Sequence, residues 1–230
     1  MLCEAAAMNL PDLPDEKELF ELAVSTGDGC ERICGSREPQ VALLAVAAFQ
    51  LQAAAVGARM ATMAGTPAYT ASLREVAGDY GGVASASINL AVRSAVTATD
   101  LCAAAAGRLA GRTPGGTREM DAAEFAKFRR RDGIPPIFER VADQLIARLG
   151  TDIWKDTEAL RAEVTHKRYN RGIYATTKAR TDQSPLAFPQ HIDIAWGKAG
   201  MTPLDVVCRT VVIYATDTFR QFCAGIAAMS

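Results

Sequence analysis

The stretch from Pro39 to Ala58 runs for twenty residues without a charged side chain. A helix of this length and composition either spans a lipid bilayer or packs inside a folded domain. The stretch contains Gln40, Gln50 and Gln52, is rich in weakly hydrophobic alanine, and has flanking basic residues with no bias to one side. We therefore expect a buried helix of a soluble domain here, with a membrane span as the alternative.

Helical spacing of apolar residues recurs along most of the chain. Hydrophobic residues make up 49% of the sequence and aromatic residues only 7%, and this alanine-rich balance favours closely packed helices over sheets. We predict an all-α helical bundle with no sheet beyond an incidental pair of residues. The stretch 25–36 is expected to be a loop with one helical turn, and 172–202 is expected to be a loop. Helices are expected at residues 15–24, 38–63, 68–78, 83–110, 120–131, 137–149, 151–170 and 203–228.

Charge and cysteine usage limit the classes of function. The net charge is −1 and the isoelectric point is near 6.2. The protein as a whole therefore does not attract RNA electrostatically, and any contact with RNA has to come from a local cluster of basic residues. Cys30 and Cys34 form a C-x3-C pair, but no second pair or nearby histidine completes a zinc set. The later cysteines, Cys102, Cys208 and Cys223, are expected in the core. We predict no metal and no cofactor.

The first residues of the chain lack the basic region and the sustained apolar run of a secretory signal. Free thiols without an export signal suit a reducing compartment. We therefore expect a cytoplasmic protein that does not insert into a membrane.

The segment 151–170 carries one of the two histidines, His166, and an arginine five residues earlier, Arg161. Thr151 or Asp152 is expected to cap the first turn of this helix, because either side chain can accept a hydrogen bond from a free backbone N–H. Apolar residues at intervals of seven and four predict one buried stripe of Ile153, Leu160 and Val164. Arg161 and His166 lie off that predicted stripe.

Arginine and histidine together suit the cleavage of RNA without a metal. Imidazole exchanges a proton near neutral pH and can act as the general base on a ribose 2′-OH. Guanidinium holds a phosphate through two parallel hydrogen bonds and keeps its charge. Residues five apart on a helix diverge by about 140°, so we expect a second copy of the chain to complete the site. The alternative is a surface arginine and a helix-terminal histidine that titrates normally.

The run from Arg161 to His166, RAEVTH, resembles the R-x4-6-H motif of the HEPN superfamily of helical ribonucleases, toxins and phage-defence proteins. Ala162 stands where many members have asparagine. The resemblance implies a single domain over 1–230, with an N-terminal helical extension at 1–80 and a core bundle at 83–230. It further implies a homodimer and an antitoxin or defence-system partner protein.

The segment that follows the motif contains basic residues and no acid from 167 to 180. Basic and aromatic side chains together suit a single-stranded nucleic acid, and a solvated linker with tyrosines packed beneath it is the alternative. The predicted RNA-binding residues are Lys167, Arg168, Tyr169, Arg171, Lys178 and Arg180.

Asp100 and Glu163 are candidates to support the site, and for Asp100 a solvent-facing or capping role is the alternative. Three functions remain open at this point. The first is a metal-independent endoribonuclease of the HEPN type in a toxin or phage-defence role. The second is the same fold without catalysis, binding RNA, a nucleotide or a protein. The third is a helical interaction protein in which Arg161 and His166 face water.

Overall fold

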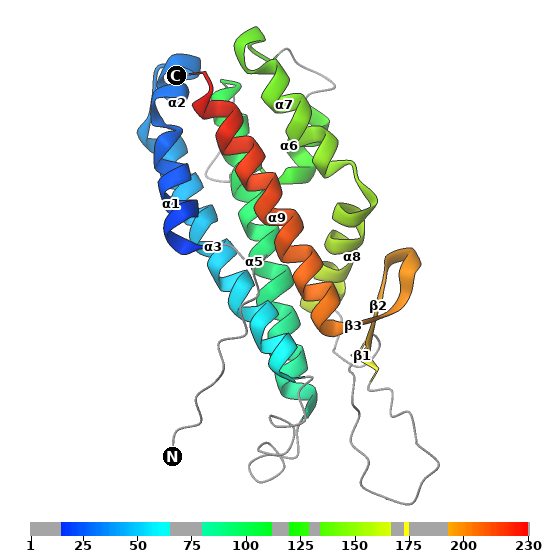
Figure 1. The fold of residues 1–230 in the computed structure, drawn as a ribbon. Helices are drawn as coiled ribbons and strands as arrows, with labels where there is room; N and C mark the ends of the chain where they lie inside the picture. The colour runs from blue at the N-terminus through cyan, green and yellow to red at the C-terminus, as the bar shows by residue number, and fades with distance from the viewer. Residues whose placement is uncertain are drawn as a thin grey trace, which may run out of the picture.

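The computed structural model describes residues 15–64, 80–111, 120–128, 134–166, 173–174 and 193–229. These residues are mostly helical (Figure 1), which confirms the predicted all-α helical bundle. The helices are α1 (Glu16–Ser25), α2 (Gly27–Cys34), α3 (Glu38–Ala64), α5 (Tyr80–Leu109), α6 (Ala122–Phe128), α7 (Pro136–Leu149), α8 (Asp152–His166) and α9 (Leu204–Ala227).

Helices α3, α5 and α9 run side by side through the middle of the bundle (Figure 1). α1 and α2 pack against α3 and α9 on one side, while α6, α7 and α8 lie on the other side of α5 and α9. α3, which lies within the expected N-terminal extension at 1–80, is therefore itself one of the central helices. The end of α9 meets α2, where Arg32 Nη1 donates a 2.8 Å hydrogen bond to the carbonyl of Met229.

Small residues let α3 and α5 approach closely. A Cβ atom at Gly57 of α3 would overlap the backbone nitrogen of Ala91 on α5. Glycine in a helix interior costs about 1 kcal/mol relative to alanine, and here it is required because the backbone of the neighbouring helix occupies the place of a side chain. Both helices also carry buried alanines, such as Ala54 and Ala95. The alanine-rich composition thus serves close helix packing.

The charge-free stretch lies within α3, and only one of its faces is buried. Among the described residues, Glu38–Met63 is the one helix long and apolar enough to cross a membrane, and 44% of its apolar window is buried in the bundle. The core helix expected here is present. Its outward face, however, carries exposed apolar side chains, including Phe49.

The loop with one helical turn expected at 25–36 is wrong, because residues 27–34 form the eight-residue helix α2. The glycines that suggested a turn are packing positions: a Cβ atom at Gly29 would overlap the backbone carbonyl of Ile226 on α9. Only Gly35, at the end of α2, adopts the left-handed conformation that typically ends a helix. Cys30 and Cys34 therefore lie one turn apart on a helix, and both are free thiols.

The expectations of one long loop over 172–202 and of no sheet beyond an incidental pair of residues are also wrong, because strands form within this stretch. β1 (Ile173–Tyr174), β2 (Asp193–Trp196) and β3 (Gly200–Pro203) make an antiparallel sheet in the order β1-β2-β3. β2 pairs with β3 around a short 3₁₀ turn, and Gly197 and Gly200 supply the positive φ angles that this tight connection needs. Ile194 of β2 is buried and ties the sheet to the core.

The predicted extents of the long helices agree with the structure to within a few residues for α3, α5, α7 and α9. α6 is shorter than its predicted range of 120–131, and its described part ends at Phe128. The helix expected at 68–78 lies outside the described residues.

Candidate functional site

The start of α8 is fixed to α9 through polar contacts. Thr151 Oγ1 accepts a 3.3 Å hydrogen bond from the backbone nitrogen of Trp154, which confirms the predicted cap. Arg148, at the end of α7, donates to the carbonyl of Tyr214 at 3.0 Å and to Thr218 Oγ1 at 3.1 Å. Its guanidinium also lies 3.9 Å from the centre of the Tyr214 ring. These contacts set where α8 begins and which way it faces.

The predicted stripe of α8 is confirmed at Leu160, which is buried, and at Val164, which packs against the core, but it is wrong at Ile153. The buried residues of the helix are Trp154, Thr157 and Leu160. Trp154 is 6% exposed, whereas Ile153 is 37% exposed. The three buried residues recur at intervals of three, so the face is set by the large indole ring and not by the isoleucine before it. Arg161 follows Leu160 and is four residues from Thr157, which places it at the edge of the buried face.

Arg161 is paired within its own helix. Its Nη2 donates a 3.0 Å hydrogen bond to Glu158 Oε2. Its Nε is buried and has no hydrogen-bond partner in the part of the chain that the structure describes. The side chain as a whole is still 44% exposed. Arg161 is therefore oriented on one edge by Glu158 and open to solvent elsewhere.

Asp100 of α5 lies near this pair and caps α6. Its Oδ1 accepts a 3.0 Å hydrogen bond from the backbone nitrogen of Ala122, so the capping alternative for Asp100 is confirmed. Burial raises the pKa of Asp100 from 3.8 to about 6. The hydrogen bond from Ala122 lowers this pKa, the charge of Glu158 raises it, and the charge of Arg161 lowers it.

The same helix end carries a reciprocal cap. Asp121 Oδ1 accepts a 2.8 Å hydrogen bond from the backbone nitrogen of Glu124, and Glu124 Oε2 accepts one of 3.2 Å from the backbone nitrogen of Asp121. Asp121 also adds to the upward shift of the Asp100 pKa. The amino end of α6 therefore gathers acidic groups next to the contact between α5 and α8.

The structure brings Asp100, Glu158 and Arg161 together at this contact. His166 is the last residue of α8, and its side chain is outside the described residues. Glu163 is exposed on α8. The predicted RNA-binding residues Lys167, Arg168, Tyr169, Arg171, Lys178 and Arg180 also lie outside the described residues.

Sequence reasoning missed Glu158 as the partner of Arg161. The signal was available, because residues three apart on a helix are neighbours and an acid before a base is the favoured order. The approach of Asp100 was not available from the sequence, since it depends on which face of α5 meets α8.

Within the described ranges, no group of three His, Cys, Asp or Glu side chains is placed to hold a metal ion. The chain matches no known family model, and no curated protein or solved structure matches it. No comparison supports the resemblance to HEPN proteins, which stays a prediction from the Arg161–His166 motif.

Proposed function

We propose that the protein is a metal-independent endoribonuclease of the HEPN type, with Arg161 as the phosphate ligand and His166 as the general base. The observation that supports this proposal is the state of Arg161. Its guanidinium is held in place by Glu158, is partly exposed, and retains an N–H without a partner among the described residues. A buried unpaired N–H costs free energy, and an anionic oxygen would satisfy it.

In this proposal, His166 removes the proton from a ribose 2′-OH, and the 2′ oxygen attacks the adjacent phosphorus. The bond from phosphorus to the 5′ oxygen breaks, the 5′ oxygen takes up a proton, and a 2′,3′-cyclic phosphate remains. Arg161 stabilises the negative charge that accumulates on the phosphoryl oxygens. Glu158 acts as a positioning residue that fixes the guanidinium before substrate arrives. Such a nuclease fits a cytoplasmic homodimer with a toxin or phage-defence role and an antitoxin or defence partner.

The test is the incubation of purified protein with mixed RNA in EDTA. Wild-type protein should yield 2′,3′-cyclic or 3′-phosphate ends, and a substrate with 2′-deoxyribose at the cut site should stay intact. His166→Ala should lower the rate by about 10²–10⁴-fold, the usual contribution of a positioned general base. Arg161→Lys should be nearly as damaging as Arg161→Ala, because an ammonium does not reproduce the planar fork.

Arg140→Ala is the matched control, because Arg140 is an exposed arginine on α7. It should cleave at the wild-type rate. Equal cleavage by wild type and His166→Ala would identify a contaminating nuclease and remove the proposal.

The second candidate is a binding protein of the same fold without catalysis. It is favoured by the internal pairing of the site, because Glu158 already occupies one edge of Arg161 and Asp100 is engaged with α6. RNA that is retained but not cut would select this candidate. Lys178→Ala or Arg180→Ala should then weaken RNA binding. Each should also reduce the salt slope by about 0.7 for every single-strand phosphate that the variant no longer neutralises.

A further inference from the structure

The outward face of α3 carries a continuous apolar row. Its residues follow one another at alternating intervals of four and three residues along the helix. We call this row the outer stripe, and its members are Ala42, Val46, Phe49, Ala53, Val56, Met60 and Met63. Phe49 is 66% exposed, and Val46, Val56 and Met63 are each close to half exposed. The opposite face of the same helix, which includes Leu44 and Leu51, is fully buried in the bundle.

The spacing of the outer stripe is that of a coiled-coil contact. Alternation of four and three residues defines the a and d positions of a heptad repeat, which face a partner helix. Soluble monomers rarely expose a contiguous apolar patch of more than a few hundred Å². A second helix packed along α3 would remove this surface from water.

The outer stripe borders a hollow that an aromatic ring can enter. This hollow has a volume of about 640 Å³ and is lined by Asp15, Lys17, Phe20, Ala45, Ala48, Phe49 and Gln52. Phe20 of α1 is itself more than half exposed. An exposed ring beside an open apolar hollow is self-complementary, because two copies of the same surface can fill each other.

The two charges of α3 indicate which partner fits. Glu38 and Arg59 are the only charged residues in the α3 sequence, and both are exposed. They are three heptads apart and both occupy the g position, beside the outer stripe. In an antiparallel pair, g positions of the two helices face each other. A twofold axis midway between them sets each Glu38 opposite the partner's Arg59 and leaves Phe49 next to the axis. A parallel pair would instead bring like charges level with each other.

We propose that α3 is the homodimer interface of this protein, formed by antiparallel packing of the outer stripes of two copies. The exposed parts of the large apolar side chains on α1 and α3 amount to roughly 500 Å² per chain, so a dimer buries about 1,000 Å², near the lower limit for a specific interface. α8 lies on the other side of α5 from α3 (Figure 1). This interface therefore does not bring the second copy to the proposed ribonuclease site, and a partner that completes that site would have to bind through a different surface.

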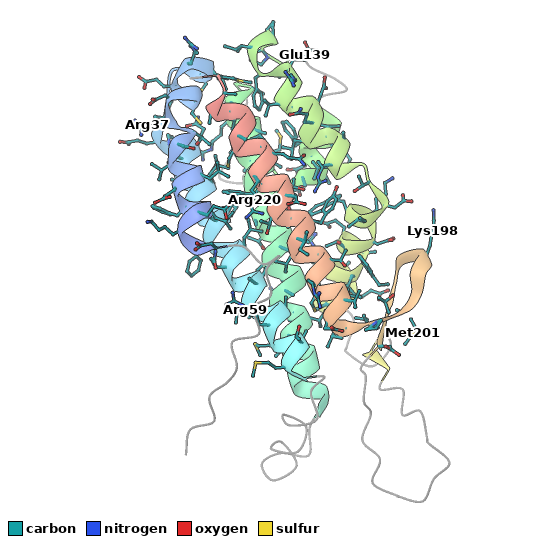
Figure 2. All side chains as sticks on the ribbon, in the orientation of Figure 1. Arg37, Arg59, Glu139, Lys198, Met201 and Arg220 are labelled. Carbon is teal, nitrogen blue, oxygen red and sulfur yellow. The ribbon has the colours of Figure 1, made fainter. Side chains whose placement is uncertain are left out.

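A lipid bilayer fits the surroundings of α3 less well. α1 packs along α3, and its Asp15, Lys17 and Glu18 would enter the membrane with it. Glu18 also forms a 2.8 Å ion pair with Arg220 of α9, which links the charged side of α1 to the bundle. Figure 2 shows Arg59 on α3 and Arg220 on α9 within the length of the helices. Burial of so many charges in lipid is costly.

The first test is the mass of the full-length protein by light scattering across micromolar concentrations. Wild type should have twice the chain mass of 24.5 kDa. Phe49→Glu should give monomers with an unchanged helical circular dichroism spectrum. Ile137→Glu is the control, because Ile137 is a similarly exposed apolar residue on α7, and it should remain dimeric. A monomeric wild type, or a dimer that survives Phe49→Glu, would overturn the proposal.

The second test reverses charges at the interface. Glu38→Arg and Arg59→Glu should each weaken dimerisation by about tenfold, because each creates two like-charge contacts per dimer in place of two modest ion pairs. The double variant should regain the wild-type dissociation constant. Failure of the double variant to recover would exclude the antiparallel arrangement. Flotation with phosphatidylcholine–phosphatidylglycerol vesicles that depends on Phe49 would assign the outer stripe to a membrane instead.

Discussion

Helices α3 and α8 both pack against α5, but the side chains at the two contacts differ in size and in polarity. At the contact of α3 with α5, small residues bring the backbones together, and Gly57 leaves room only for the backbone of Ala91. The buried face of α8 contains the large side chain of Trp154, and charged groups gather where α8 meets α5.

The size of the side chains explains the difference. Small residues allow close approach, and a close contact leaves no space for a charged group with its hydrogen-bond partners. Where α8 meets α5, the charged side chains Asp100, Glu158 and Arg161 lie close together instead. The closely packed side of the bundle is therefore apolar, whereas the side with α8 carries the charged residues of the candidate site.

The largest expected effect comes from removing the buried indole ring of Trp154, which holds α8 against the bundle. Trp154→Ala should lower the free energy of unfolding by about 3–5 kcal/mol, the usual cost of removing a buried aromatic ring. Urea denaturation followed by circular dichroism would measure it. Ile153→Ala is the matched control on the same helix and should cost less than about 1 kcal/mol, because Ile153 is partly exposed. Equal costs would mean that the buried face of α8 runs through Ile153.

A somewhat smaller effect tests the contact between α3 and α5. Gly57→Leu should lower the free energy of unfolding by about 2–3 kcal/mol, because the new side chain must displace the backbone of α5 at Ala91. Ala159→Leu, an exposed position on α8, should change stability by no more than about 0.5 kcal/mol. Tolerance of leucine at position 57 would show that α3 and α5 can separate, and the contrast between the two contacts would then disappear.

The long helices and the short elements differ in how far the sequence predicts them. The extents of α3, α5 and α9 follow from long apolar runs with helical spacing, because a pattern repeated over many turns has few alternatives. The shorter elements were missed. Gly27 and Gly29 look like turn residues but serve close packing within and beside α2. The pairing of β2 with β3 involves four residues on each strand, too few for a clear alternation.

The candidate site was predicted in part. The helix that carries Arg161, its cap at Thr151 and the capping alternative for Asp100 came from local sequence signals that the structure confirms. The proximity of Asp100 to Arg161 could not be predicted, because these residues are far apart in the chain and meet only through helix packing. The role of His166 and of the basic residues after it stays a prediction.

The smallest expected effect concerns the carboxyl group of Asp100. Its pKa is raised from 3.8 to about 6 in the folded protein. The folded state therefore binds this proton more tightly than the unfolded state.

The stability that the proton contributes is fully present below about pH 4 and is lost as the pH rises through about 6. At neutral pH the ionised carboxylate is a net cost, because burial and the charge of Glu158 outweigh the hydrogen bond from Ala122 and the charge of Arg161.

Asp100→Asn should remove that cost while its amide oxygen still caps α6. The variant should be more stable than wild type by about 1–2 kcal/mol at pH 7, after allowance for partial solvent screening. The difference should shrink to near zero at pH 4, as followed by urea denaturation of both proteins at each pH. Asp28→Asn, at an exposed carboxylate on α2, is the matched control for the loss of one negative charge. A stability difference between Asp100→Asn and wild type that does not change with pH would mean that Asp100 is not held in an unfavourable ionised state. The polar character of the α8 contact would then come from Glu158 and Arg161 alone.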